Sequence, residues 1–555
     1  MKFVAVIAAL SLGAASAASA SAAALPARHA ERAALTSTTQ APAATSSAIA
    51  GNVCLGSGIA SALAGAAPGD LLAPPQDVTA TSKLGTGRLY RVAYATTGAA
   101  DSVVASCALI AVPSASSLKN GAIKGVVAWA HGTLGVQAKC QPSNKPVNFA
   151  GPMPTGIGAV AAGGDQSDGA LYNMLRSGYA VAATDYPSAG VGGPGMQRFV
   201  LGVAEGLAVL DSARTVTRNA ARFGLAPVAA NAQLPLVTWG HSQGGGSALW
   251  AGQLAADYLK RQGDTTLNLA GVAAEAPASQ FTTSPGQPKA YLGRHLGDLD
   301  MYNFDPGLQK KFPIGVAFFS FAMASWSEVA NATAGAFAFG PTAKVDYRDV
   351  LTPDGAHTAP KIAQHCLSKS GFLDLYVLAV KYLYPDKYRF FAPPFAGAKV
   401  AGTWQGGIDA TCNDPSSQPQ AIRDWCAWLQ FNMPGPNGVN PYSKLPRDND
   451  GRKVPIYIAQ GRADTIIWCV DGNGKVQGTN CLTDQLFHSL EPAYCDGTGY
   501  LEVDYFPKVG HLDIPNAAAK NPATGAYQGS PLDTFVRGAM GRSLSPMCSA
   551  DPDAS

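Results

Sequence analysis

The chain has 555 residues, 14% of them charged, and its 40 basic and 37 acidic side chains give a formal net charge of +3. This balance, without a basic run or a nucleic-acid motif, argues against nucleic acid or another polyanion as a partner. The length exceeds one ordinary hydrophobic core, so we expect a main domain with a large insertion or a second domain.

The N-terminal residues have the composition of an export signal. Residues 1–24 contain a lysine, an apolar stretch of about ten residues and a run of small residues, which predicts a secretory signal peptide. Residues 25–50 are rich in Ala, Ser and Thr and predict a disordered leader. No later segment reaches the length of a transmembrane helix. We therefore expect a secreted protein, extracellular or periplasmic.

The ten cysteines all follow the predicted signal peptide. An even number of cysteines in an oxidising compartment predicts disulfides, about three to five of them, rather than a metal site. No CxxC pair and no HExxH motif occurs. We expect neither a metal nor another cofactor.

Downstream of the leader, strand-like segments alternate with helical ones. In chain order the sequence predicts antiparallel strands over 88–97 and 103–113, a strand over 124–132, a helix over 169–178, a strand over 179–187, a helix over 197–223 and a strand over 270–279. Apolar strands that alternate with helices predict a mostly parallel sheet with helices on both faces.

A glycine-rich pentapeptide interrupts this pattern between an apolar run over 234–239 and a helical pattern over 247–259. It reads Gly240-His241-Ser242-Gln243-Gly244. Glycines two positions before and after a serine fit a turn so tight that only glycine leaves room near the serine. Strand, turn and helix in this order predict a nucleophile elbow with Ser242 at its tip, and with it the α/β-hydrolase fold.

The alternation stops after residue 279 and returns at 453–467 and 500–511. Residues 280–452 contain helical segments broken by Gly and Pro, and no clear strand. We interpret this block as a helical cap inserted between two halves of the hydrolase core, 51–279 and 453–555. Residues 316–326 are unusually apolar, which fits either the core of the cap or a lid surface that meets an apolar substrate or an interface.

A serine nucleophile needs a base and an acid that orients the base, and in this fold they follow the serine in the order acid, then histidine. Five histidines follow Ser242, namely His295, His357, His365, His488 and His511. His511 is the predicted base, because it alone follows a predicted strand of the core at its edge. Asp464, directly after another strand, is the predicted acid. The acids judged less suitable are Asp471, Asp504 and Asp513.

The oxyanion formed during ester cleavage requires backbone N–H donors. The elbow supplies the amide of Gln243, the residue after the nucleophile. The loop after the strand over 124–132 is expected to supply the second donor, from Thr133 or Leu134. His131 in that loop is interpreted as structural rather than as a base.

Several segments together resemble the secretory lipases of the lipase-A type, extracellular esterases of fungi and bacteria. They are PGDLL (68–72), YRVAYATT (90–97), AWAHGTLG (128–135), DYPSAG (185–190), VLDSAR (209–214), GHSQGGGSALWAG (240–252), GRAD (461–464) and GH (510–511). The resemblance implies an α/β-hydrolase with a helical cap, and a triad of Ser242, Asp464 and His511. It also implies a disulfide between Cys495 and Cys548, which leaves Cys469 and Cys481 to close the polar insertion between them.

The expected activity is hydrolysis of carboxylic esters, with acylglycerols or simpler esters as substrates and a lipid interface as a transient contact. The alternatives are a polyester depolymerase, a peptidase, an acyltransferase and, in another class, a binding protein on an inactive hydrolase fold. The sequence does not indicate an oligomeric state.

Overall fold

The computed structural model describes residues 51–82, 84–149, 169–187, 191, 195–229, 232–282, 303–305, 310–312, 314–333, 340–367, 369–382, 389–400, 403–405, 407–442, 444–467, 469 and 481–551. The predicted signal peptide and leader lie outside these residues. All described residues belong to one compact unit, 42–555. Within the described ranges, no helix is long and apolar enough to span a membrane.

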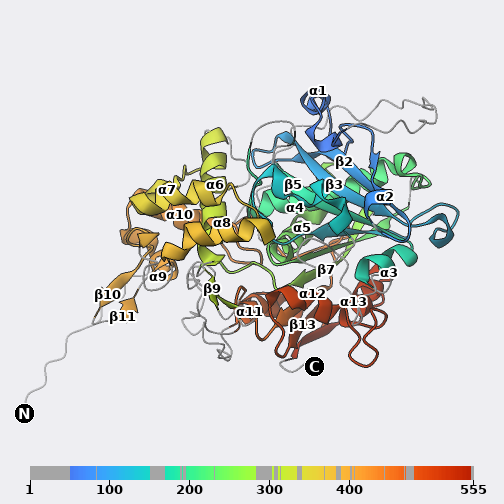
Figure 1. Ribbon diagram of the computed structural model, residues 1–555. Coiled ribbons are helices and arrows are strands. Elements are labelled where there is room, and N and C mark those ends of the chain that lie inside the picture. Colours follow the sequence, from blue (N-terminus) through green and yellow to red (C-terminus); the bar gives the residue numbers. More distant parts are fainter. Residues whose placement is uncertain are drawn as a thin grey trace, which may run out of the picture. The chain divides into compact units, whose positions relative to one another are not determined.

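A ten-stranded sheet forms the core, and its strands β2, β3, β5, β7 and β13 are labelled in Figure 1. The strand order is β1-β2-β3-β5-β4-β6-β7-β12-β13-β14. The strands are β1 Gln76–Asp77, β2 Arg88–Thr97, β3 Val103–Val112, β4 Gly125–Ala130, β5 Tyr179–Pro187, β6 Leu234–His241, β7 Leu267–Glu275, β12 Ile456–Gly461, β13 Tyr500–Phe506 and β14 Met547–Asp551. Pairing is antiparallel from β1 to β5 and parallel from β5 to β14. The predicted α/β-hydrolase sheet is confirmed, although the edge strands β1 and β14 are not among the expected strands.

Helices cover both faces of this sheet. The helices of the core are α1 Ile59–Leu63, α2 Thr79–Ser82, α3 Ala170–Arg176, α4 Gly202–Arg218, α5 Gln243–Arg261, α11 Leu482–Tyr494, α12 Ile514–Ala518 and α13 Pro531–Met540. Successive residues of a strand point to opposite faces. In β7, Gly271 lies against Phe535 of α13, whereas Val272 lies against Gly252 of α5, so α5 and α13 cover opposite faces. The predicted helix over 197–223 is shorter than expected, because residues 197–201 form a loop before α4.

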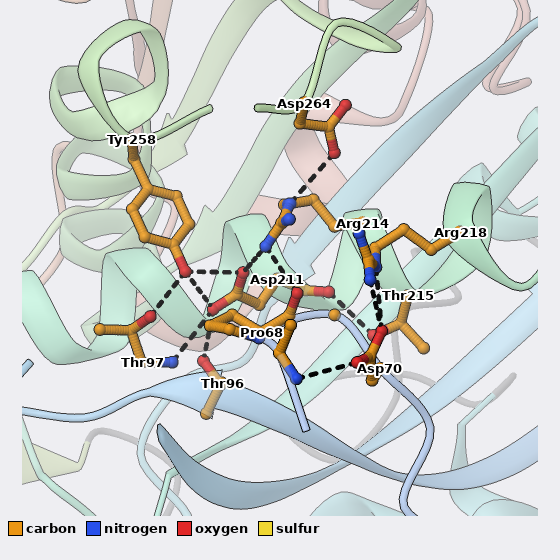
Figure 2. A network of polar contacts seen from close by, with 12 residues as sticks. Pro68, Asp70, Thr96, Thr97, Asp211, Arg214, Thr215, Arg218, Tyr258 and Asp264 are labelled. Carbon is orange, nitrogen blue, oxygen red and sulfur yellow. Dashed lines mark hydrogen bonds and ion pairs between the residues drawn. The ribbon is translucent and has the colours of Figure 1, made fainter. Parts of the chain in front are cut away.

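An ion-pair network with a buried centre and one exposed pair links α4 to its neighbours (Figure 2). Asp211 accepts hydrogen bonds from Arg214 Nη1 at 2.8 Å and from the Tyr258 hydroxyl at 2.7 Å, and Arg214 also donates to the carbonyl of Pro68 at 2.7 Å. The other members are Thr96, Thr97, Asp264 and the pair Arg218–Asp70. The segments PGDLL and VLDSAR therefore contact each other and have a structural role. Removing one partner of a buried pair leaves an uncompensated charge, which is strongly destabilising.

The chain between β7 and β12 contains the cap, which is mostly helical. Its helices are α6 Ile314–Thr333, α7 Pro353–Ile362, α8 Lys369–Ala379, α9 Ile408–Asn413 and α10 Gln420–Phe431. The expectation of a block without strands is wrong, because two short antiparallel hairpins occur, β8 Asn303–Asp305 with β9 Lys310–Phe312 and β10 Ala398–Val400 with β11 Thr403–Gln405. Residues 316–326 lie within α6 and are largely buried. The segment therefore contributes to the core of the cap, and five of its residues also line the cavity described below.

All ten cysteines form disulfides, and no described cysteine is free. The pairs are Cys54–Cys107, Cys140–Cys366, Cys412–Cys426, Cys469–Cys481 and Cys495–Cys548. The two pairings that followed from the family resemblance are both present. Five disulfides are typical of a protein that folds in an oxidising compartment.

Candidate functional site

The tight turn between β6 and α5 places Ser242 where the chain leaves the sheet. Ser242 has φ +61° and ψ −121°, a backbone conformation that residues other than glycine rarely adopt. A Cβ on Gly240 would lie 2.2 Å from the carbonyl oxygen of Gly244, and a Cβ on Gly244 would lie 1.9 Å from that of Ala130. Glycine is therefore required at both positions, and the turn has the backbone of the predicted elbow.

The predicted base and acid are paired. Asp464 follows β12 and His511 follows the neighbouring parallel strand β13, so both side chains leave the same edge of the sheet. His511 Nδ1 lies 2.8 Å from Asp464 Oδ2, and both residues are buried. Because the carboxylate accepts the proton on Nδ1, the lone pair of the neutral ring is on Nε2, which is the arrangement that a general base requires.

The carboxylate of Asp464 is satisfied on both oxygens. The backbone amides of Ile466 and Ile467 donate to Oδ1 at 2.8 and 3.0 Å, and Gln460 Nε2 donates to Oδ2 at 3.1 Å. Four donors, including His511, compensate for the loss of water around this fully buried group. Asp464 is therefore held in one orientation toward the histidine ring.

The histidine ring lies beside the elbow. The rings of His241 and His511 have their centroids 4.6 Å apart, and His241 directly precedes Ser242 in the chain. In the described part of the chain, neither Ser242 Oγ nor His511 Nε2 has a hydrogen-bond partner of its own. A serine hydroxyl rotates about its Cα–Cβ bond, and catalytic hydrogen bonds often form only when substrate is bound.

Two of the predicted oxyanion donors, Gln243 and Thr133, lie at the same cavity as Ser242. Gln243 is the first residue of α5, where backbone amides have no partner within the helix and the helix dipole favours negative charge. Leu134 is buried, and its carbonyl accepts a hydrogen bond from the amide of Leu367 in the cap at 2.9 Å.

His131, interpreted as structural, is buried in the same loop. Burial lowers the pKa of its ring to about 4, so the ring is neutral near pH 7. Its Nδ1 lies 2.6 Å from the carbonyl of Gly132, and its own carbonyl accepts from the Tyr186 hydroxyl at 2.8 Å. These contacts hold the backbone of the loop after β4, which is the structural role expected for His131.

The other candidate residues occupy different surroundings. His357 and His365 belong to the cap, where His357 contacts Lys361 and His365 contacts Asp374. His488 on α11 pairs with Glu491 at 3.0 Å, and Asp504 on β13 accepts from the Tyr457 hydroxyl at 3.1 Å. His295 and Asp471 lie outside the described residues, and Asp513 is an exposed neighbour of His511.

A buried acid that the sequence did not predict lies on α4, in contact with the start of α5. Glu205 on α4 accepts hydrogen bonds from Gln243 Nε2 at 2.5 Å, from Ser247 Oγ at 2.6 Å and from the amide of Val200 at 2.8 Å. Burial raises the pKa of its carboxyl to about 7. The one signal in the sequence was an acidic residue inside an otherwise apolar stretch of helix.

An apolar cavity of about 750 Å³, including the part open to solvent, extends from Ser242 into the cap. Its polar lining comes from Thr133, Ser242 and Gln243. The remaining lining is Phe199, Val200, Ala278, Phe281, Phe318, Phe319, Ala322, Met323, Trp326, Phe395, Ile408, Trp425, Leu429, Ile466 and Ile467. The cavity thus offers hydrogen-bond donors at one end and hydrocarbon or aromatic surface elsewhere. Among the described residues, no cluster of His, Cys, Asp and Glu has the arrangement of a metal site.

One segment of the chain matches a known family model. Residues 164–285, which include the elbow, match the model of the secretory lipase family. The resemblance to the secretory lipases is confirmed. No curated protein matches the sequence.

Two solved structures illustrate the shared fold. Lipase A of Candida antarctica in its closed state superposes with a TM-score of 0.55 at 14% identity, covering 89% of this chain and 87% of that chain. The rice cell wall degrading esterase LipA from Xanthomonas oryzae gives 0.51 at 13% identity, covering 85% of this chain and 98% of that chain. At such identities the likeness supports the α/β-hydrolase fold alone.

Proposed function

We propose that this chain is a secreted carboxylic-ester hydrolase that uses Ser242 as nucleophile, His511 as general base and Asp464 as the acid that orients it. The observation that carries this proposal is the buried Asp464–His511 pair beside an elbow serine that opens into an apolar cavity. Export is inferred from the signal-like residues 1–24 and fits the five disulfides.

The reaction follows from these groups. Ser242 Oγ attacks the ester carbonyl carbon while His511 Nε2 takes the hydroxyl proton, and the carbonyl oxygen becomes an oxyanion. The amide of Gln243 and an amide of Thr133 or Leu134 stabilise that charge. When the carbon–oxygen bond to the alcohol breaks, the alcohol leaves with the proton from His511, and the acyl group stays on Ser242. Water then attacks the acyl-enzyme by the same steps and releases the carboxylic acid.

The cavity indicates the substrate class. Apart from Thr133, Ser242 and Gln243, the described residues that line it are apolar, and these residues provide no partner for a charged or strongly polar substrate group. Each methylene that moves from water into such a lining contributes about 0.8 kcal/mol. We infer that an alkyl acyl chain occupies it, as in acylglycerols and other fatty esters.

The test is labelling with a fluorophosphonate, which reacts with an activated serine, together with hydrolysis of a panel of esters of increasing acyl length. The protein should be labelled and should hydrolyse esters, whereas Ser242→Ala should do neither and keep its melting temperature. Retention of more than about a tenth of the turnover in Ser242→Ala contradicts the proposal, since loss of a triad serine removes several powers of ten.

A further inference from the structure

We infer that His241, the residue before the nucleophile, is a positioning residue that fixes the backbone of His511 relative to Ser242. The inference rests on the proposed function, in which Ser242 and His511 exchange a proton. It concerns a side chain outside the proposed triad and oxyanion donors.

The decisive contact joins the elbow to the loop of the base. His241 Nε2 lies 2.9 Å from the carbonyl oxygen of His511, and both residues are buried. A carbonyl oxygen only accepts, so the hydrogen of the His241 ring is on Nε2. The opposite tautomer would place a lone pair against the carbonyl and leave a buried N–H at Nδ1 without an acceptor.

The surroundings of the ring support this assignment. Among the described residues, His241 Nδ1 has no hydrogen-bond partner. A Cβ on Gly132 would lie 3.4 Å from that nitrogen, so the loop after β4 packs closely on this side of the ring. Burial, and to a smaller extent the neighbouring His511, lowers the pKa of His241 well below its ordinary value of 6.5. The ring is therefore neutral, with one donor, and that donor is used on His511.

His511 is consequently held at two points by two different elements. Asp464, after β12, holds the imidazole at Nδ1, and His241, at the end of β6, holds the backbone carbonyl. Because His241 and Ser242 are consecutive residues, this hydrogen bond fixes the position of His511 relative to Ser242. A misplacement of about 1 Å between reacting groups reduces the rate on the order of 100-fold, so this link bears on kcat.

The chain allows a matched pair of substitutions. In His241→Gln, the amide nitrogen occupies the place of Nε2 and keeps a donor for the His511 carbonyl. In His241→Asn, the amide is one methylene shorter, and its nitrogen occupies the place of Nδ1 instead. His241→Leu removes the donor while filling similar space.

The experiment measures kcat and KM with a short, water-soluble ester, the rate of fluorophosphonate labelling and the melting temperature for each variant of the full chain. We expect His241→Gln to keep kcat within a few-fold of the wild type. His241→Asn and His241→Leu should lose kcat by about tenfold to 100-fold, with KM nearly unchanged and labelling slowed in proportion. Equal losses of kcat in His241→Gln and His241→Asn, or wild-type kcat in His241→Leu, overturn the inference.

Two comparisons separate this outcome from other failures. If His241→Leu does not fold, the Gln and Asn variants still decide the question, because they differ only in the reach of one amide. If Ser242→Ala remains active, the proposed function itself is wrong. If Ser242→Ala is inactive and the His241 variants are all fully active, only the positioning role is wrong.

Discussion

Cys140, in the loop after β4, is bonded to Cys366 of the cap, 226 residues later in the chain. Two hydrogen bonds accompany the disulfide, from the amide of Leu367 to the carbonyl of Leu134 and from Gln137 Nε2 to the carbonyl of Ala363, both at 2.9 Å. The loop that carries a proposed oxyanion donor is therefore attached to the end of α7. These three contacts therefore join the cap to that loop.

We predict that replacing both cysteines of this bridge by serine lowers kcat as well as stability. The matched control is the double serine variant at Cys412 and Cys426, a bridge with a sequence separation of 14 that lies within the cap. The chain-entropy model gives about 5 kcal/mol for the long loop and about 3 kcal/mol for the short one, so both variants should unfold at lower temperature. Well below the unfolding transitions, kcat should fall in the Cys140/Cys366 variant alone. Equal kcat in the two variants would show that the disulfide does not support the loop.

Asp464→Asn is expected to reduce kcat by about 10⁴-fold with little change in KM or melting temperature. The amide presents a hydrogen to the ring of His511 and favours the tautomer whose Nε2 cannot accept the serine proton. Asp513→Asn, at an exposed acid two residues from His511, is the control and should retain activity. Steady-state kinetics of the three proteins decides the matter, and a silent Asp464→Asn beside a damaging Asp513→Asn would reverse the assignment of the acid.

Glu275, a buried acid at the end of β7, predicts that stability falls as the pH rises from about 4.5 to about 8. Glu275 ends β7, and burial raises the pKa of its carboxyl from the ordinary 4.5 to about 8. The folded state keeps this proton up to about pH 8, whereas the unfolded chain releases it above 4.5. Its favourable contribution is therefore complete below pH 4.5 and is lost as the pH rises to about 8, by about 1.4 kcal/mol for each pKa unit.

Glu275→Gln removes that titration and keeps the shape of the side chain. Between pH 5 and pH 9, the free energy of unfolding should fall less in this variant than in the wild type, as measured by urea denaturation at several pH values. Glu328→Gln, at a partly exposed glutamate of α6 that pairs with Arg198, should follow the wild-type profile. Parallel profiles for Glu275→Gln and the wild type would mean that another group causes the fall in stability over this pH range.

The parts of the site that the sequence could predict depend on local constraints. The elbow is recognisable because the close approaches at Gly240 and Gly244 restrict those positions to glycine, and Asp464 is recognisable because it follows an apolar strand. Long-range contacts leave no such pattern. The role of Glu205 depends on α4 lying against α5, and the pairing of Cys140 with Cys366 depends on where α7 ends. The edge strands β1 and β14 are short, and the cap hairpins have only a few residues on each side, which is too few for a period of two to be seen.

The width of the cavity at α6 should set the preferred acyl length. Ala322 is a small residue on its wall, between the turns that contribute Phe318 and Trp326. Ala322→Trp should block the space beyond it, so that methylenes of a long acyl chain lose their burial while a butanoate ester is unaffected. At about 0.8 kcal/mol for each methylene, exclusion of two methylenes lowers kcat/KM about 15-fold for that ester.

Asn331→Trp adds the same side chain at an exposed position of α6 and should leave the preference unchanged. The measurement is kcat/KM for a series from butanoate to hexadecanoate, with circular dichroism to verify folding. A uniform decrease across the whole series would place the acyl chain elsewhere than in this cavity.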